Sequence, residues 1–185
     1  QDTTTTATPS DEVYVAGQKI PMRKGDVIFW VTPDVRVHRM LELAKVGPGD
    51  VVYDLGCGGG RIVIAAARDF GARGVGIDID PQRIKDANEN VQRSGVGDKV
   101  RIIQADLFEA NISEATVVTL YLLPSLNQKL MPKLVKELKP GTRIVSNTFD
   151  MGDWKPLKEI KLDDGDDQDT YLSHKFFLWI VPEPQ

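Results

Sequence analysis

The sequence of 185 residues predicts an α/β fold, a doubly wound and mostly parallel sheet that ends in an antiparallel hairpin. Short apolar segments of strand type alternate with segments whose apolar residues recur at helical spacing, which is typical of parallel strands joined by helices. The last two strand-like segments flank an acidic turn, which is typical of a hairpin. The length suits one domain, and the sequence has no internal repeat.

The first 28 residues lack the pattern of a folded domain. Residues 1–10 are rich in Thr and have no apolar periodicity, so we expect a disordered tail. Residues 12–28 predict an irregular extension with a short hairpin. We therefore place one folded domain at residues 29–185. We expect a cytoplasmic location; the sequence does not begin with Met, so an exported form with a cleaved signal is the alternative.

The elements of the domain follow one another without a second boundary. Thr32 predicts a helix start, because a capping hydroxyl is followed by Pro33 and an acidic residue. The expected helices span residues 32–45, 62–70, 81–94 and 124–139. The expected strands span residues 51–55, 74–78, 100–104, 116–122 and 143–146, and the hairpin strands span residues 157–162 and 171–181. Residues 116–122 are apolar on both faces, as in a central parallel strand.

A glycine loop at residues 56–60 lies between the first strand of the sheet and the next helix. Four of its five residues are Gly, which permits tight turns and close approach of the backbone to a ligand. A strand, a glycine loop and a helix start in this order bind nucleotide-like ligands. The dinucleotide fingerprint would need Gly or Ala at Arg61, and the phosphate-binding triplet Gly-Lys-Ser/Thr is absent. What remains is Asp54-x-Gly56-x-Gly58-x-Gly60, in which the carboxylate favours a ligand that carries an ammonium group.

This pattern resembles motif I of the class I S-adenosylmethionine (SAM) methyltransferases. From residue 30 to residue 154 the chain also resembles the seven-strand protein lysine methyltransferases of the archaeal broad-specificity group and the mitochondrial enzymes that methylate the ATP-synthase c-subunit. The matching blocks are residues 31–33, 40–44, 53–58, 60–67, 74–78, 113–119, 137–143 and 149–154. The resemblance implies a Rossmann-like seven-stranded sheet, SAM as the cofactor, and methylation of protein lysine side chains.

Three segments at the carboxyl ends of successive strands are expected to hold SAM. The loop holds the methionine part, a carboxylate at Asp78 accepts hydrogen bonds from the ribose hydroxyls, and Asp106 accepts from the adenine amino group. Asp80 lies beyond the strand, and we expect it to cap the following helix. A solvated loop position is the alternative for each acid taken alone. With the resemblance, the expected cofactor-binding residues are Thr32, Asp54, Gly56, Cys57, Gly58, Gly60, Asp78, Ile79, Asp106 and Leu107.

The chain departs from the pattern of these enzymes at three places. Gly59 stands where an acid is usual in the glycine loop, and Val31 stands where Pro is common. Asn147 and Thr148 replace a pair that contains His. The last change affects the expected substrate side more than the cofactor side.

Methyl transfer to an amine is an in-line displacement, for which the protein aligns the reactants and excludes water. A lysine nucleophile must be neutral, which a desolvated channel favours. Tyr121, at the end of the expected fourth strand, is our first candidate for positioning the amine, with plain core packing as the alternative. Asn147 and Trp154, after the fifth strand, are further catalytic candidates, and Phe149 could complete the wall.

Composition excludes several other classes. The net charge of −4 does not favour nucleic acid as a partner. No apolar run approaches the roughly 18–20 residues of a membrane span. A single Cys and two separated His residues give no metal-ligating pattern, so we expect no metal. We expect a monomer that acts on a protein lysine; methylation of a small-molecule amine and non-catalytic SAM binding are the alternatives.

Overall fold

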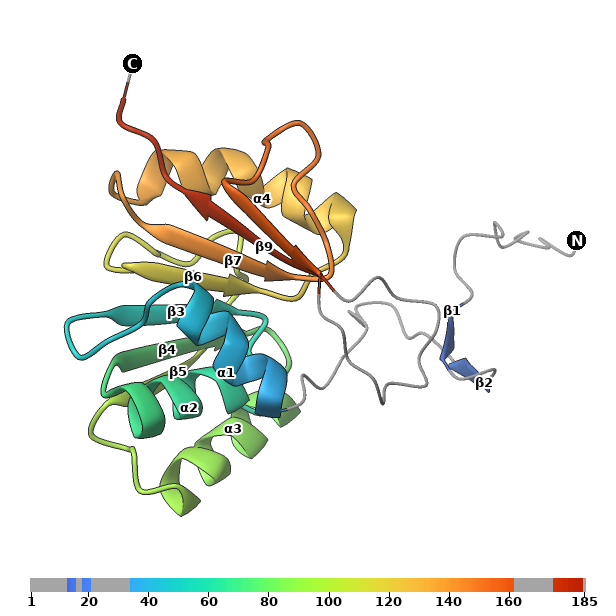
Figure 1. Cartoon of the computed structure of the whole chain (residues 1–185). Coiled ribbons are helices and arrows are strands. Elements are labelled where there is room, and N and C mark those ends of the chain that lie inside the picture. Colours follow the sequence, from blue (N-terminus) through green and yellow to red (C-terminus); the bar gives the residue numbers. More distant parts are fainter. Residues whose placement is uncertain (1–12, 16–17, 21–33, 162–174, 185) are drawn as a thin grey trace, which may run out of the picture.

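The computed structural model describes residues 13–15, 18–20, 34–161 and 175–184. Its main feature is a seven-stranded sheet in the order β5-β4-β3-β6-β7-β9-β8. The strands are β3 (Val51–Leu55), β4 (Arg73–Asp78), β5 (Val100–Gln104), β6 (Val117–Leu120), β7 (Arg143–Asn147), β8 (Lys158–Lys161) and β9 (Lys175–Ile180). The first five are parallel, and β9 runs antiparallel between β7 and β8. The predicted mostly parallel sheet with a terminal hairpin is confirmed (Figure 1).

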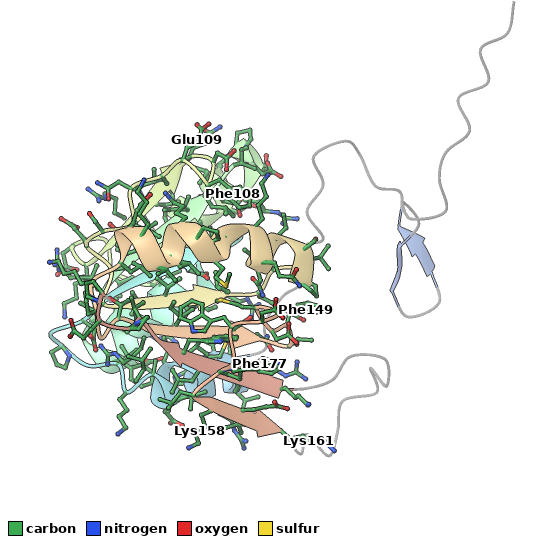
Figure 2. The ribbon with its side chains drawn as sticks, turned by 90° about the horizontal axis from the view of Figure 1, so that it is seen from above. Phe108, Glu109, Phe149, Lys158, Lys161 and Phe177 are labelled. Atoms are coloured by element: carbon green, nitrogen blue, oxygen red, sulfur yellow. The ribbon has the colours of Figure 1, made fainter. Side chains whose placement is uncertain are left out.

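Helices cover both faces of the sheet in the region described (Figure 1). They are α1 (Asp34–Leu43), α2 (Arg61–Phe70), α3 (Pro81–Arg93) and α4 (Pro124–Glu137). Apolar residues of α1 and α2 pack with Val52, Val117 and Val145 on one face, and α3 packs with α2 beside them. Leucines of α4 pack on the other face against Leu55, Leu120 and Trp179. Figure 2 shows α4 lying across that face.

The predicted elements are present, with small shifts at their ends. The short hairpin expected in residues 12–28 is confirmed as β1 (Val13–Val15) paired with β2 (Gln18–Ile20). The strand expected at residues 116–122 ends at Leu120, so Tyr121 lies in the connection to α4 rather than in the sheet. Residues 32 and 33 of the first expected helix, and the acidic turn of the hairpin, lie outside the described residues.

Glycines in β4 let α2 and the loop before it lie close to the sheet. A Cβ at Gly74 would stand 2.8 Å from Cβ of Val63 in α2. A Cβ at Gly76 would stand 2.8 Å from Sγ of Cys57. Distances this short cannot be accommodated without moving the helix or the loop. The two glycines therefore fix how near the start of α2 comes to the end of β4.

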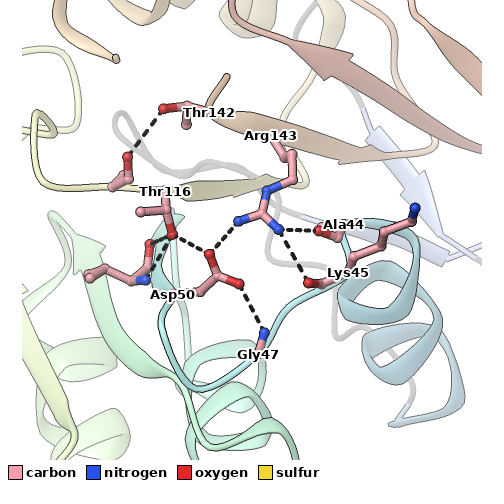
Figure 3. A network of polar contacts seen from close by, with 9 residues as sticks. Ala44, Lys45, Gly47, Asp50, Thr116, Thr142 and Arg143 are labelled. Atoms are coloured by element: carbon pink, nitrogen blue, oxygen red, sulfur yellow. Dashed lines mark hydrogen bonds and ion pairs between the residues drawn. The ribbon is translucent and has the colours of Figure 1, made fainter. Parts of the chain in front are cut away.

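A polar network ties the strands together at their amino ends (Figure 3). Thr116 Oγ1 donates to Asp50 Oδ1 over 2.7 Å, and the backbone N of Gly47 donates to Asp50 Oδ2 over 2.9 Å. The Arg143 guanidinium forms an ion pair with Asp50 and donates to the Ala44 carbonyl over 2.8 Å. The network joins the end of α1 to the starts of β3, β6 and β7.

The network lowers the pKa of Asp50. Burial alone would raise it, but the hydrogen bonds from Thr116 and Gly47 and the charge of Arg143 hold the pKa of Asp50 below its ordinary value. A carboxylate whose pKa is lowered by folding stabilises the fold above its unfolded pKa, and this contribution is lost as the pH falls through the folded pKa.

Asp50→Asn should therefore lower the free energy of unfolding by roughly 1–3 kcal/mol at pH 7, because Arg143 would lose its partly buried counter-charge. The deficit should shrink as the pH falls from the ordinary Asp value through the lowered pKa of folded Asp50, where the wild-type carboxylate becomes protonated and loses its charge. Urea unfolding at several pH values measures both effects. Asp98→Asn, in the exposed turn before β5, is the control and should change stability by less than about 0.5 kcal/mol. Equal effects of the two substitutions would refute the role of the network.

Among the described helices, none combines the length and the apolar character that a membrane span requires.

Candidate functional site

The parallel strands all end at one edge of the sheet, and the order of the strands reverses there between β3 and β6. The chain passes from β3 to β4 and β5 on one side, then crosses to β6 and β7 on the other. Ligands of doubly wound sheets bind outside the carboxyl ends of the strands at this reversal. The segments that follow β3, β4, β5, β6 and β7 are therefore the ones that build the site.

The glycine loop between β3 and α2 lies on the end of β4. The backbone N–H groups of Gly56 and Cys57 both donate to the Ile77 carbonyl, over 2.8 and 2.9 Å. Gly56, Gly58 and Gly60 have φ values of 86°, 51° and 81°, in the left-handed region that side chains rarely adopt. Gly59 does not share this conformation. The alternating glycines of the sequence are thus required by the backbone, whereas the glycine at position 59 is not.

The start of α2 faces this loop and presents backbone donors. Gly60 is its N-cap residue, and no side chain caps the first turn. The N–H groups of a first helical turn have no partner within the helix, so they bind anionic or carbonyl oxygens of a ligand. The Cys57 side chain instead faces the sheet against Gly76, and burial raises the pKa of its thiol. Cys57 therefore serves this loop through its backbone and its small size.

Asp54 is buried beneath the loop at the point where the strand order reverses. It lies in register with Thr119 of β6, and Thr119 Oγ1 donates to Asp54 Oδ1 over 2.9 Å. Burial, which disfavours the charged form, raises the pKa of Asp54 to about 7. The hydrogen bond from Thr119 opposes this shift, and the nearby Asp78 carboxylate adds to it. A positive group beside Asp54 would favour its ionised form.

Asp78 ends β4, as predicted, and its carboxylate is held by two backbone donors. The Gly58 N–H donates to Asp78 Oδ2 over 2.9 Å, and the Asp80 N–H donates to Oδ1 over 3.0 Å. The prediction that Asp80 caps the next helix is confirmed, since its Oδ1 accepts from the N–H of Gln82. Ile79, between them, is 58% exposed. An exposed apolar side chain beside a fixed carboxylate suits a nucleoside, which has a flat apolar base and a hydroxylated sugar.

Asp106 and Leu107 follow β5 on the same edge. The Phe108 N–H donates to Asp106 Oδ1 over 2.8 Å, which fixes a tight turn. Leu107 is half-buried against the core on the α4 side. The ammonium of Lys129, from α4, lies 4.6 Å from the centre of the Phe108 ring and joins this turn to the helix. Asp54, Asp78 and Asp106 thus lie at or just beyond the carboxyl ends of three neighbouring strands, as expected, while Thr32 lies outside the described residues.

The other half of the edge is built by the segments after β6 and β7. Tyr121 and Phe149 lie with their ring centres 6.2 Å apart. Asn147, at the end of β7, is fully buried; its Oδ1 accepts from Thr148 Oγ1 over 3.1 Å, and its Nδ2 has no hydrogen-bond partner. The structure therefore brings the Tyr121 and Phe149 rings together at the rim, and Asn147 is joined to Phe149 by a hydrogen bond from the Phe149 N–H to the Asn147 carbonyl.

Trp154 does not reach this rim. Its carbonyl accepts from Nε1 of Trp179 over 2.8 Å, and the two rings lie 6.2 Å apart. Trp179 pairs with Ile144, three residues before Asn147 on β7. Three residues of strand correspond to roughly 10 Å, so Trp154 packs nearer the middle of the sheet.

Two residues at the edge were missed in the sequence. Thr119 is the partner of Asp54, and Asn127 of α4 donates to the segment after β7. A polar residue inside the apolar segment 116–122 was a signal for Thr119. Asn127 gave no comparable signal, because an Asn in a helix is usually exposed. Among the residues described, no group of three His, Cys, Asp or Glu side chains could hold a metal ion.

The raised pKa of Asp54 predicts a dependence of stability on pH. A folded pKa of about 7, against the ordinary 3.8, means that the contribution of Asp54 to stability is fully present below about pH 4 and is lost as the pH rises through 7. Asp54→Asn does not titrate. The free energy of unfolding of this variant should therefore rise, relative to wild type, by at least about 1 kcal/mol between pH 4 and 7.5 in ligand-free protein. Urea unfolding measures it, and a constant difference would contradict a buried carboxyl with a raised pKa.

The backbone of the loop predicts that an added side chain affects stability at one glycine and not at its neighbour. Gly60→Ala should lower the free energy of unfolding by about 1–2 kcal/mol, because Ala is strained in the left-handed region. Gly59→Ala should change it by less than about 0.5 kcal/mol. A Cβ at position 59 would meet only Nδ2 of Asn90, at 3.4 Å. Thermal unfolding of both variants provides the comparison. A larger loss from Gly59→Ala would contradict this loop conformation.

Comparison with known proteins agrees with this geometry. The family model for the ANTKMT methyltransferase domain matches residues 54–158. A protein-lysine N-methyltransferase of Saccharolobus islandicus is 48% identical over 153 residues, which cover 82% of this chain and 92% of the relative. An adenine nucleotide translocase lysine N-methyltransferase of Mus musculus is 34% identical over 122 residues, 66% of this chain and 53% of the relative. These matches confirm the resemblance to protein lysine methyltransferases inferred from the sequence.

A solved structure gives the same result for the fold. It is an RNA methyltransferase from Salinibacter ruber in complex with S-adenosyl-L-homocysteine, with 54% identity and a TM-score of 0.78. The match covers 84% of this chain and 96% of that protein. The chain belongs to the family of ANTKMT methyltransferase domains, and it is a SAM-dependent methyltransferase.

Proposed function

We propose that the protein methylates the ε-amino group of lysine side chains in proteins by direct in-line transfer. The observation that carries this proposal is the 48% identity to a protein-lysine N-methyltransferase over 92% of that relative. The chemistry of the edge supports it, because one half offers a cradle for a nucleoside and the other an aromatic rim for an alkyl amine. The methyltransferase domain in this proposal comprises residues 29–185.

The cofactor half of the site consists of backbone donors and three carboxylates. In the proposal the loop of Gly56, Cys57, Gly58 and Gly60, with Asp54 beneath it, holds the methionine part of SAM. Asp78 accepts from the ribose hydroxyls, and Ile79 covers one face of the adenine. Asp106 and Leu107 contact its edge, and Thr32 closes the methionine end. The fit rests on the anchored loop, the exposed Ile79 and the buried Asp54, whose ionised form a cation would stabilise.

SAM supplies a methyl group on a positively charged sulfur, which a neutral amine can attack directly. The task of this chain is then to align that amine and to exclude water. Tyr121 and Phe149 form the apolar wall along which the lysine side chain would lie. In the proposal Asn147 orients the amine from the end of β7, where its Oδ1 can accept an N–H of the amine and leave the nitrogen lone pair free for the methyl group. The apolar rings also disfavour the ammonium form of the incoming lysine.

RNA methylation is the second candidate, because the solved relative with 54% identity is named as an RNA methyltransferase. Binding of RNA depends mainly on cationic side chains that contact phosphates. This chain has 27 acidic against 23 basic residues, and its cofactor edge carries Asp78, Asp80 and Asp106. The charge therefore favours a cationic acceptor over a polyanion. Small-molecule amine methylation and non-catalytic SAM binding are the remaining alternatives.

Incubation with methyl-labelled SAM and a cell lysate separates these functions. The proposal expects label in the protein fraction, resistant to ribonuclease, and N-methyl-lysine after acid hydrolysis. Label lost on ribonuclease treatment would establish RNA as the acceptor, and label in the small-molecule fraction would establish a metabolite. SAM binding without any label would indicate a binding protein. The Asp78→Ala variant is the control for background labelling, because the substitution should weaken SAM binding by about 1–3 kcal/mol.

In this proposal the enzyme acts as a monomer in the cytoplasm, where SAM is supplied. Sedimentation with and without SAM tests the first statement, and fractionation of the source cells tests the second.

Tyr121→Ala tests the acceptor side of the proposal. It should reduce turnover by about tenfold or more, equivalent to roughly 1.4 kcal/mol in the barrier, because the amine would lose its wall. The affinity for SAM should stay within a factor of about two, since Tyr121 lies after β6 and the cofactor is held by β3, β4 and β5. Steady-state kinetics and calorimetry measure the two quantities.

Tyr121→Phe then distinguishes two roles for the ring. Retained turnover would mean that the ring only shapes the channel, and lost turnover would mean that the hydroxyl orients the amine. A Tyr121→Ala protein that unfolds or loses SAM binding would instead place Tyr121 in the core and remove it from the acceptor site.

A further inference from the structure

The segment after β7 adopts a conformation that its sequence alone would not favour. Thr148 has a φ of 71°, and the Phe149 N–H donates to the Asn147 carbonyl over 2.9 Å, so these three residues form a tight turn. A β-branched residue with a positive φ is rare and costs about 1–2 kcal/mol. Gly152 makes a second bend with a φ of 65°, closed by its N–H donating to Asp150 Oδ1 over 2.9 Å. We call residues 147–152 the acceptor loop.

Strain of this kind persists only where surrounding contacts hold it in place. The Thr148 N–H donates to the Lys175 carbonyl at the start of β9 over 2.7 Å. Met151 is fully buried in the core on the α4 side. These contacts anchor the two ends of the acceptor loop, and Phe149 and Asp150 lie between them.

Asn127, in the second turn of α4, holds this middle part. It is fully buried, and its Nδ2 lies 3.3 Å from the Phe149 carbonyl, 3.1 Å from the Asp150 carbonyl and 3.4 Å from Ser146 Oγ. The two N–H groups of a single amide are thus shared among three acceptors on one loop and its strand. Figure 2 shows Phe149 beside one end of α4.

The other atom of the same amide supports a specific role for Asn127. Its Oδ1 is buried and has no hydrogen-bond partner in the structure. A buried acceptor without a partner costs about 1–3 kcal/mol, and an apolar residue would avoid this cost only by leaving the Phe149 and Asp150 carbonyls without their donor. The useful part of the Asn127 side chain is therefore its donor group. Through this group α4, which follows Tyr121 in the chain, is joined to the segment after β7 that contains Phe149.

We infer that Asn127 is a positioning residue for methyl transfer: it clamps the acceptor loop to α4 and so fixes the Phe149 ring relative to Tyr121. In-line displacement depends steeply on alignment, and a shift of about 1 Å can reduce the rate a hundredfold. The inference rests on the proposed function only in placing the acceptor at this rim. Asn127 contacts neither the acceptor nor the cofactor in this arrangement and acts through the loop.

The test compares Asn127→Ala and Asn127→Asp with Leu134→Ala, a buried position two turns further along the same helix. Asp keeps the shape of Asn but has one O–H donor when protonated and none when ionised, so it cannot replace the two N–H donors that hold the Phe149 and Asp150 carbonyls. Transfer of label from SAM is measured on whichever lysate fraction the wild type labels. Both Asn127 variants should lose tenfold or more in kcat while the SAM Kd stays within twofold. Leu134→Ala should lose stability but keep its kcat at temperatures where it is folded.

Hydrogen exchange provides a readout that does not require an acceptor. Peptides covering residues 148–152 should exchange at least tenfold faster in Asn127→Ala than in wild type, and no faster in Leu134→Ala. If Asn127→Ala cannot be purified, Thr148→Gly serves instead, because it relieves the backbone strain and loosens the same loop. Its kcat should fall without a fall in melting temperature.

The outcomes separate the inference from the proposed function. Label in RNA or metabolites, with the same kinetic losses, would refute lysine as the acceptor and leave the inference standing. Unchanged kcat or unchanged exchange in Asn127→Ala would overturn the inference, as would an equal loss of kcat in Leu134→Ala. If the wild type labels nothing, the exchange result alone decides.

Discussion

The cofactor side of this enzyme depends on how closely the glycine loop lies on β4. Gly76 leaves room for the Cys57 side chain, and the Ile77 carbonyl accepts hydrogen bonds from two consecutive loop amides. Once the loop is fixed there, its Gly58 N–H reaches the Asp78 carboxylate at 2.9 Å. The close approach is therefore what turns two separate sequence features, an alternating glycine motif and an acid ending the next strand, into one surface. A side chain at position 76 would displace the loop and break all of these contacts together.

The charges at the two edges of the sheet have opposite consequences. At the amino edge, Asp50 is paired with Arg143, and the pair joins elements without responding to a ligand. At the carboxyl edge, Asp54 and Asp78 are near enough for the charge of Asp78 to raise the pKa of Asp54. Two carboxylates that destabilise each other in the ligand-free protein are stabilised by a cation between them. In the proposed complex the ammonium of SAM would lie beside Asp54 and favour its ionised form, which would offset part of this destabilisation.

The features that could be predicted from the sequence are those that depend on local residues. The alternation of strands and helices, the terminal hairpin, the cap at Asp80 and the turn after β3 each follow from residues within one segment. The distinct conformation of Gly59 could not be predicted, because four glycines look alike in a sequence and only the backbone shows which three need a positive φ. Thr119 and Asn127 were missed for a different reason. The role of Thr119 arises from parallel register, which joins it to a residue 65 positions away. The role of Asn127 arises from helix packing, which joins it to residues 19 to 23 positions away. Trp154 was placed at the rim from its position after β7, but the chain turns back there to pack on Trp179.

The two halves of the edge also differ in how much strain they contain. In the cofactor half, glycines occupy the left-handed positions and each carboxylate described has donors. In the acceptor half, Thr148 takes a left-handed conformation without being Gly, and Asn127 and Asn147 each keep a buried polar atom without a partner. Violations of local preference collect at functional sites because the rest of the fold can hold them there. Asn147 and Thr148 are also where the sequence departs from the pattern of the lysine methyltransferases that it resembles. The strained half of the edge therefore coincides with a departure from that pattern, whereas the other departure within the site, Gly59, lies in a loop position that carries no backbone strain.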